Sequence, residues 1–332
     1  MSTTLHPLSM LKFLCMGELR TKNIGDAFLV VWKLPTSDST SKSISRSRGS
    51  IIEAKSAVAP EDPPQSAQQL SQHIAEAALA SMLIIHSSLK RSKVLANISQ
   101  RSDIQDRLPD FTVSMGFGLH VGWAIEGAIG SRYKIDPSYL SPHVNMAARL
   151  EAATKQYKVP ILLSDSFVSL LSQPVRKKCR AIDTVRVKGS MVPTTLYTYD
   201  MDTSTVSTNS GRQEMNFPHE SQQDSGKDGD FAKHETFSDY PYFDEFEEHP
   251  DLVAAACKHT ESFYFDFNKA YDAYVQGDWD ISMKILQAIQ ECEKRDGTRY
   301  HDGPCSALLS FMRSLNGHPP PSWPGCRDLS EK

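Results

Sequence analysis

Four short segments of the sequence are candidates for a functional site, and three of them carry side chains well suited to chemistry: a carboxylate, an amide, a guanidinium and two ammonium groups. These groups belong to Asp26, Asn145, Arg149, Lys22 and Lys188. Carboxylates bind divalent cations, and guanidinium and ammonium groups stabilise charge on phosphoryl oxygens. Each residue alone also has a structural explanation, since aspartate is common in turns and polar residues one helical turn apart line exposed helix faces. The joint order and spacing of the four segments favours a shared site.

The four segments match the motifs of one enzyme family in sequence order. They read LRTKNIGDAFLVVW (residues 19–32), GFGLHVGWAIEGAIGS (116–131), KIDPSYLSPHVNMAARLEAATKQY (134–157) and RVKG (186–189). The patterns K-x-I-G-D-A-F, G-x-H-x-G, V-N-x-A-x-R-x-E and V-K-G within them resemble the class III nucleotidyl cyclase catalytic domain, the adenylyl and guanylyl cyclase family. The resemblance covers residues 19–200, and the sequence of these motifs is most similar to that of cyclases of unicellular eukaryotes.

The resemblance implies cyclisation of a nucleoside triphosphate. In that reaction the ribose 3′-oxygen attacks the α-phosphate in line and expels pyrophosphate. Two divalent cations, Mg²⁺ or Mn²⁺, lower the pKa of the attacking hydroxyl, and a fixed guanidinium stabilises the phosphoryl charge. The family's pattern implies these roles: Asp26 binds metal, Asn145 orients the ribose, Arg149 stabilises the transition state, Lys188 holds the terminal phosphates, and Lys22 and Ser138 read the base.

The two base-reading positions favour ATP as the substrate and cyclic AMP as the product. A lysine ammonium, as at Lys22, can donate a hydrogen bond to adenine N1, whereas guanine N1 carries a proton and needs a carboxylate. Guanylyl cyclases of the family have glutamate at the Lys22 position, and some adenylyl cyclases have threonine or serine where this chain has Ser138. A guanylyl cyclase is the alternative on this point.

The sequence departs from the family's pattern at its first metal ligand. The family places that aspartate on a strand before the Asp26 hairpin, followed by two helices, but residues 1–20 contain no aspartate. Class III sites form between two domains, so we expect a homodimer or a heterodimer with another cyclase domain. A partner or a longer chain would complete the two-metal site. The alternative is a catalytically incomplete cyclase half that acts as a dimerising regulatory module.

A second departure is Trp123, at a place where some members of the family carry a phosphate-binding arginine. An indole cannot bind phosphate in that way. We expect Trp123 to pack in the core.

The hydrophobic pattern predicts an α+β fold, with strands and helices interspersed with hairpins. The resemblance makes this a ferredoxin-like class III cyclase sandwich that lacks its first strand and the following helices. A C-terminal helical hairpin adds to it. We expect strands at 21–24, 27–32, 112–121, 124–129, 160–163, 180–187 and 194–199, and helices at 67–90, 145–156 and 165–171.

Composition divides the chain into four parts. An atypical N-terminal segment (residues 1–18) precedes the cyclase domain (19–200), which contains a serine-rich insertion predicted to be disordered (35–66). An acidic linker (201–250) follows, with twelve acidic and three basic residues and hence a local charge of −9. A TPR-like helical segment (251–332) ends the chain.

The overall composition excludes several classes of protein. The chain has 332 residues and a formal charge of −4, which argues against a nucleic-acid binder. Its six cysteines are scattered, so neither a disulfide scaffold nor a zinc site is expected. Its apolar runs are too short to cross a bilayer. We expect a cytoplasmic protein, or a membrane-associated one if the full gene product is longer.

Overall fold

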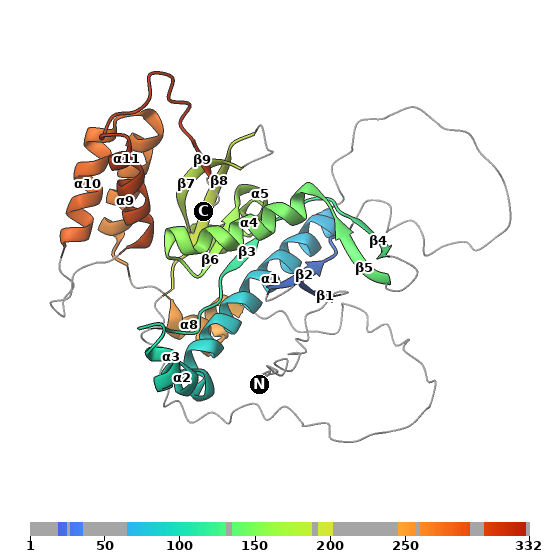
Figure 1. The fold of residues 1–332 in the computed structure, drawn as a ribbon. Coiled ribbons are helices and arrows are strands. Elements are labelled where there is room, and N and C mark those ends of the chain that lie inside the picture. Colours follow the sequence, from blue (N-terminus) through green and yellow to red (C-terminus); the bar gives the residue numbers. More distant parts are fainter. Residues whose placement is uncertain are drawn as a thin grey trace, which may run out of the picture. The chain divides into compact units, whose positions relative to one another are not determined.

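The computed structural model describes residues 19–24, 27–35, 65–109, 111–130, 135–187, 192–201, 245–256, 259–292 and 302–329 (Figure 1). Contacts divide the chain into two units. Of the described residues, those up to Ser81 belong to the first unit and those from Met82 onward to the second. The predicted insertion lies almost wholly outside the described residues, as does most of the predicted acidic linker.

The first unit contains the predicted hairpin. Strands β1 (Leu19–Ile24) and β2 (Ala27–Trp32) pair antiparallel, with Lys22 opposite Leu29. Helix α1 (Gln65–Arg91) begins in this unit and continues into the second. The prediction of a helix at 67–90 is confirmed, because a buried alanine- and leucine-rich stripe recurs along it at three- and four-residue spacing.

The second unit is built on a five-stranded mixed sheet. Its strands are β3 (Phe117–Leu119), β6 (Ile161–Ser164), β7 (Cys179–Val187), β8 (Thr194–Tyr199) and β9 (Arg327–Leu329). The order is β3-β6-β8-β7-β9, with the β3–β6 and β7–β9 pairs parallel and the others antiparallel. The strand predicted at 112–121 is reduced to the three residues of β3, and β9 was not predicted.

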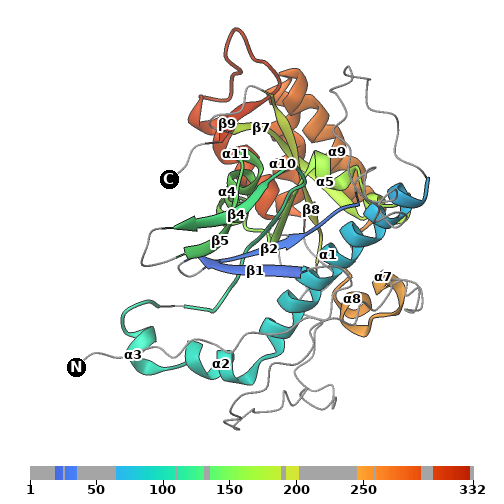
Figure 2. The same cartoon turned by 90° about the vertical axis from the view of Figure 1, so that its right-hand side faces the viewer.

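A separate hairpin precedes the main helix of this unit. Strands β4 (Ile125–Gly130) and β5 (Ile135–Leu140) pair antiparallel and extend away from the five-stranded sheet (Figures 1 and 2). The sequence predicted a strand close to β4 but none at β5, whose sequence contains a proline.

Helix α4 (Pro142–Tyr157) follows β5 directly, and clear local signals set its ends. The Ser141 hydroxyl accepts hydrogen bonds from the backbone N–H groups of His143 and Val144, and Pro142 occupies the first turn. Lys158 ends the helix in the left-handed region at φ 52°. The helix therefore begins three residues before the predicted start at residue 145.

Short helices connect these elements, and some were not predicted. Among them α5 (Asp165–Val168) is shorter than the helix predicted at 165–171. Helix α7 (Glu245–Glu248) lies inside the segment predicted to be a linker that ends at residue 250. The others are α2 (Lys93–Ser99), α3 (Ser102–Gln105), α6 (Gln173–Lys177) and α8 (Pro250–Ala255).

The C-terminal helices share one hydrophobic core with α4 and the sheet. They are α9 (Glu261–Gln276), α10 (Trp279–Glu291) and α11 (Gly303–Ser314). The predicted helical hairpin is the α9–α10 pair, joined by Gly277 at φ 91°. Buried members of the core include Leu150, Tyr157, Leu162, Ile182, Val185 and Leu196 from α4 and the sheet, and Phe267, Tyr274, Trp279, Leu286, Leu308 and Met312 from the C-terminal helices.

Two buried arginines tie the C-terminal segment to the sheet. The Arg180 guanidinium of β7 bonds Asp200 at 2.7 Å and Asp302, the N-cap of α11, at 2.8 Å. The Arg327 guanidinium of β9 donates to Asp183 at 2.7 Å and to the hydroxyl of Tyr157 at 3.0 Å. These contacts and the mixed sheet make the second unit an α+β fold, as predicted. None of the helices in the described ranges is long and apolar enough to span a membrane.

Candidate active site

Helix α4 presents two of the predicted site residues. Leu150, Ala153 and Tyr157 bury one face of the helix against the core. Asn145 lies on the opposite, exposed face, and Arg149, one turn further on, is half-buried. Ala148 and Ala152 beside them are exposed and small, so this face leaves room around the amide and the guanidinium.

Ser138 lies on the strand that leads into this helix. It is half-buried in β5, opposite Gly127 of β4. Because the Ser141 cap follows three residues later, Ser138, Asn145 and Arg149 belong to one continuous strand–helix segment. Their relative positions are therefore set by local structure.

The positions of the other three predicted site residues relative to this segment are not given by the structure. Lys22 belongs to β1 of the first unit, where its backbone pairs with Leu29. Asp26 and Lys188 lie outside the described residues. In the part of the chain that the structure describes, no group of three or more His, Cys, Asp or Glu could hold a metal ion.

The first glycine of the G-x-H-x-G motif, Gly118, allows α4 to lie directly on β3. A Cβ atom at Gly118 would come within 2.3 Å of the Ala147 carbonyl oxygen and 2.4 Å of the Glu151 backbone nitrogen. No side chain fits in that space, so the glycine is required by close helix–strand packing. The motif thus sets how closely β3 packs against the helix that carries Asn145 and Arg149.

The histidine of the same motif contacts a second histidine that the sequence analysis did not single out. His120 Nε2 lies 2.8 Å from His143 Nδ1, and the two rings stack with centroids 5.1 Å apart. Burial, with His143 nearby, lowers the pKa of His120 to about 4. The sequence signal for this pair was His143, two residues before Asn145. Its contact with His120 is apparent only in the folded structure.

Trp123 does not pack in the core, so that prediction was wrong. The indole is 59% exposed, and its edge meets the His143 ring with centroids 5.9 Å apart. It follows the end of β3 and precedes β4, where the chain leaves the sheet. It therefore belongs to the surface beside the first turn of α4.

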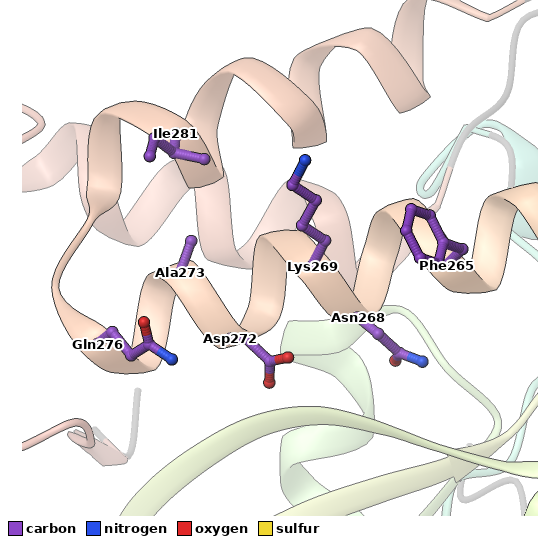
Figure 3. A pocket seen from close by; sticks show the side chains of 7 residues that line it. All are labelled: Phe265, Asn268, Lys269, Asp272, Ala273, Gln276 and Ile281. Atoms are coloured by element: carbon purple, nitrogen blue, oxygen red, sulfur yellow. The ribbon is translucent and has the colours of Figure 1, made fainter.

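A hollow of about 470 Å³ lies elsewhere, on the C-terminal helical hairpin (Figure 3). Its lining comes from α9 and the start of α10, and Lys269 and Asp272 place one charge of each sign in it. None of the predicted site residues lines it.

The comparison with protein families identifies the class to which this arrangement belongs. The family described as adenylate and guanylate cyclase catalytic domain matches residues 16–202, more than half of the chain. The chain belongs to this family of nucleotidyl cyclase domains.

Its curated relatives are much longer proteins named as adenylate cyclases. The chain is 38% identical over 86 residues to an adenylate cyclase of Anabaena cylindrica, covering 26% of this chain and 17% of that protein. It is 31% identical over 90 residues to adenylate cyclase 1 of Rhizobium meliloti (strain 1021), covering 27% and 13%. It is 29% identical over 87 residues to the terminal-differentiation-specific adenylate cyclase of Dictyostelium discoideum, covering 26% and 4%. The chain thus spans less than a fifth of the length of these relatives.

Solved structures give a weaker similarity. A structure of a bacterial light-regulated adenylyl cyclase matches 38% of this chain and 33% of its own, with 28% identity and a TM-score of 0.30. A second such structure matches 39% and 34%, with 26% identity and a TM-score of 0.28.

Proposed function

We propose that this chain supplies the nucleotide-binding half of an adenylyl cyclase site that converts ATP to cyclic AMP and pyrophosphate. The observation that carries the proposal is the β5–α4 segment, on which Ser138, exposed Asn145 and Arg149 follow one another in the family's order. The three curated relatives, each named an adenylate cyclase, support ATP as the nucleotide.

Each residue of the proposed half-site has a distinct task. Asn145 hydrogen-bonds the ribose and so aligns its 3′-oxygen with the α-phosphate. Arg149 stabilises the negative charge that grows on the phosphoryl oxygens. Ser138 and Lys22 contact the adenine, and Lys188 holds the terminal phosphates.

The proposed metal ions, Mg²⁺ or Mn²⁺, need carboxylate ligands. The described residues of this chain contain no cluster of such side chains that could hold a metal ion. In the site that uses Asn145 and Arg149 of this chain, a partner cyclase domain supplies the metal carboxylates. Asp26 is the ligand that this chain offers to the opposite site of the dimer, which lacks its second aspartate unless a longer chain supplies it. When bound, the metals make the ribose hydroxyl more acidic and offset charge on the leaving pyrophosphate.

The β4–β5 hairpin is the proposed surface for that partner, a second copy or another cyclase domain. Ile125 and Leu140 are 61% and 62% exposed and stand directly opposite each other in the hairpin, so both side chains lie on one face. Exposed Trp123 precedes the hairpin. Paired apolar side chains on a projecting hairpin favour burial against another protein surface.

A complementation assay tests the proposal. The purified chain is mixed with Mn²⁺–ATP and an intact cyclase domain whose own transition-state arginine has been replaced, so that only the mixed site can turn over. We expect cyclic AMP from this mixture and a loss of about 10²-fold with Arg149→Ala, the order found when a transition-state donor is removed. Lys155→Ala, exposed on the same helix, is the matched control. Equal output from wild-type chain and Arg149→Ala would contradict the proposal.

A regulatory module that dimerises with an intact cyclase is the second candidate, favoured by the exposed Ile125–Leu140 pair of the β4–β5 hairpin. In that case the mixture with the disabled partner yields no cyclic AMP, but the chain changes the activity of a fully intact partner. The same assay with GTP tests base selection. Comparable turnover of GTP and ATP, unaltered by Lys22→Glu, would favour a guanylyl cyclase instead.

A further inference from the structure

A hydrogen-bonded series of four polar side chains links the sheet to the first turn of α4. Its members are Ser166, Ser164, His120 and His143. His120, the residue after β3, places Nδ1 2.8 Å from the Ser164 hydroxyl and 3.3 Å from that of Ser166. Its other nitrogen, Nε2, lies 2.8 Å from His143 Nδ1. Ser164 is fully buried and caps α5, where its hydroxyl accepts a hydrogen bond from the Phe167 N–H. The His120 end of the series is therefore anchored in the sheet.

The His143 end belongs to the helix that carries the proposed ribose and transition-state groups. His143 is the second residue of α4 and precedes Asn145 by two positions. Its ring is closely enclosed, since a Cβ atom at Gly122 would come within 2.1 Å of it and Trp123 meets its face edge-on. Any rotation of the first turn about the helix axis must break the contact with His120.

The 2.8 Å distance between His120 Nε2 and His143 Nδ1 requires a hydrogen on one of these nitrogens and none on the other. A neutral imidazole has one N–H and one bare nitrogen, so one ring donates and the other accepts. The titratable and charged groups that act on His120 are His143 from α4 and Asp165 from α5. Burial and His143 favour the neutral ring, and Asp165 opposes them. The contact therefore involves a neutral His120 ring, which has one nitrogen that can donate and one that can accept.

We propose that His120 and His143 are positioning residues, whose mutual hydrogen bond fixes the first turn of α4 and thereby sets Asn145 for the ribose of the nucleotide. The inference rests on the proposed role of Asn145 and extends it to two residues that do not touch the substrate. The bond supplies direction as well as packing, because a side chain that fills the same space without a hydrogen-bonding group cannot hold the turn.

Substitutions at His143 separate the hydrogen bond from the packing. Asparagine places an amide where Nδ1 stands and can bond His120, leucine fills the space without bonding, and alanine does neither. A fluorescent ATP analogue with Mg²⁺ is titrated against the full chain at pH 7.5. We expect His143→Asn to bind like wild type, and His143→Leu and His143→Ala to bind about fivefold more weakly, the order expected for one lost hydrogen bond. His318→Ala, at an exposed histidine, is the control.

An NMR titration of the histidine rings gives a second readout, beside the rescue by His143→Asn, which packing alone does not predict. In the wild-type chain His120 stays neutral well below pH 6, and in His143→Ala its pKa rises toward the ordinary value of 6.5. Wild-type affinity in His143→Leu, or an unchanged His120 titration in His143→Ala, would overturn the inference alone. Asn145→Ala that binds as wild type would overturn the proposed function and the inference with it.

Discussion

At the scale of single residues, buried charge holds the second unit together. Arg327 and Asp183 are both buried, and the Tyr157 hydroxyl donates to the same carboxylate at 2.6 Å. Burial raises the pKa of Asp183, and the bonds from Arg327, Tyr157 and the Thr184 N–H oppose that rise. The carboxylate is therefore stable as an anion only with its arginine in place.

Replacing Arg327 by alanine should leave that carboxylate buried without its counter-charge. We expect the free energy of unfolding to fall by about 3–5 kcal/mol, the usual result of removing one partner of a buried pair. Urea unfolding followed by circular dichroism measures it. Arg101→Ala, which removes an exposed pair with Asp103, should leave the urea midpoint unchanged. Equal midpoints for the two variants would contradict the prediction.

One buried histidine, His86, and one half-buried histidine, His120, should make the protein less stable in mild acid. Burial lowers the pKa of both His86 and His120 from 6.5 to about 4. Between those two values the unfolded chain binds protons that the folded chain does not, so stability falls as the pH drops from about 6.5 to about 4. We expect the urea midpoint to fall between pH 7 and pH 5, and to fall less in His86→Leu. An equal fall in His86→Leu and wild type would exclude His86 as a source.

At the scale of elements, local signals were sufficient where neighbouring residues decide the structure. The β1–β2 hairpin, α1 and the β7–β8 hairpin could be predicted from turns and periodicity. The Ser141-Pro142 start of α4 was missed by three residues, although both residues are typical of helix N-termini.

Elements that depend on distant partners could not be predicted. Strand β9 has three residues, two of them charged, and it forms because β7 offers an edge and Asp183 binds Arg327. Part of the candidate site shares this limit. Asn145 and Arg149 follow from a sequence motif, whereas the pairing of His120 with His143 appears only when α4 lies on β3.

The close contact between α4 and β3 requires that residue 118 has no Cβ atom. We expect Gly118→Ala to destabilise the protein by about 1–3 kcal/mol, as overpacking does, because the methyl group would meet the α4 backbone. Gly127→Ala is the matched control, since nothing lies within 4 Å of a Cβ atom there. Thermal unfolding of both variants measures the difference. A Gly118→Ala protein as stable as Gly127→Ala would show that the helix can move away without cost.

At the scale of the whole molecule, the projecting β4–β5 hairpin predicts association. The double variant Ile125→Asp and Leu140→Lys should weaken self-association, or association with a partner cyclase domain, by more than tenfold. Its circular dichroism spectrum should match that of wild type, because both side chains are exposed. Sedimentation velocity measures the association. Val94→Lys, at an apolar residue that is 67% exposed on α2, is the control. Loss of association in the control as well would point to a general charge effect.

The junction of Tyr157 with Arg327 joins residues 170 positions apart in the sequence. Strand β9, which closes the β7 edge, lies within the last six residues of the chain. During synthesis β7 is made well before β9, so the sheet keeps an open edge and Asp183 lacks its counter-charge until β9 has emerged from the ribosome. Until β9 pairs, the exposed backbone of β7 can pair with other chains, so the unfinished sheet is prone to aggregation.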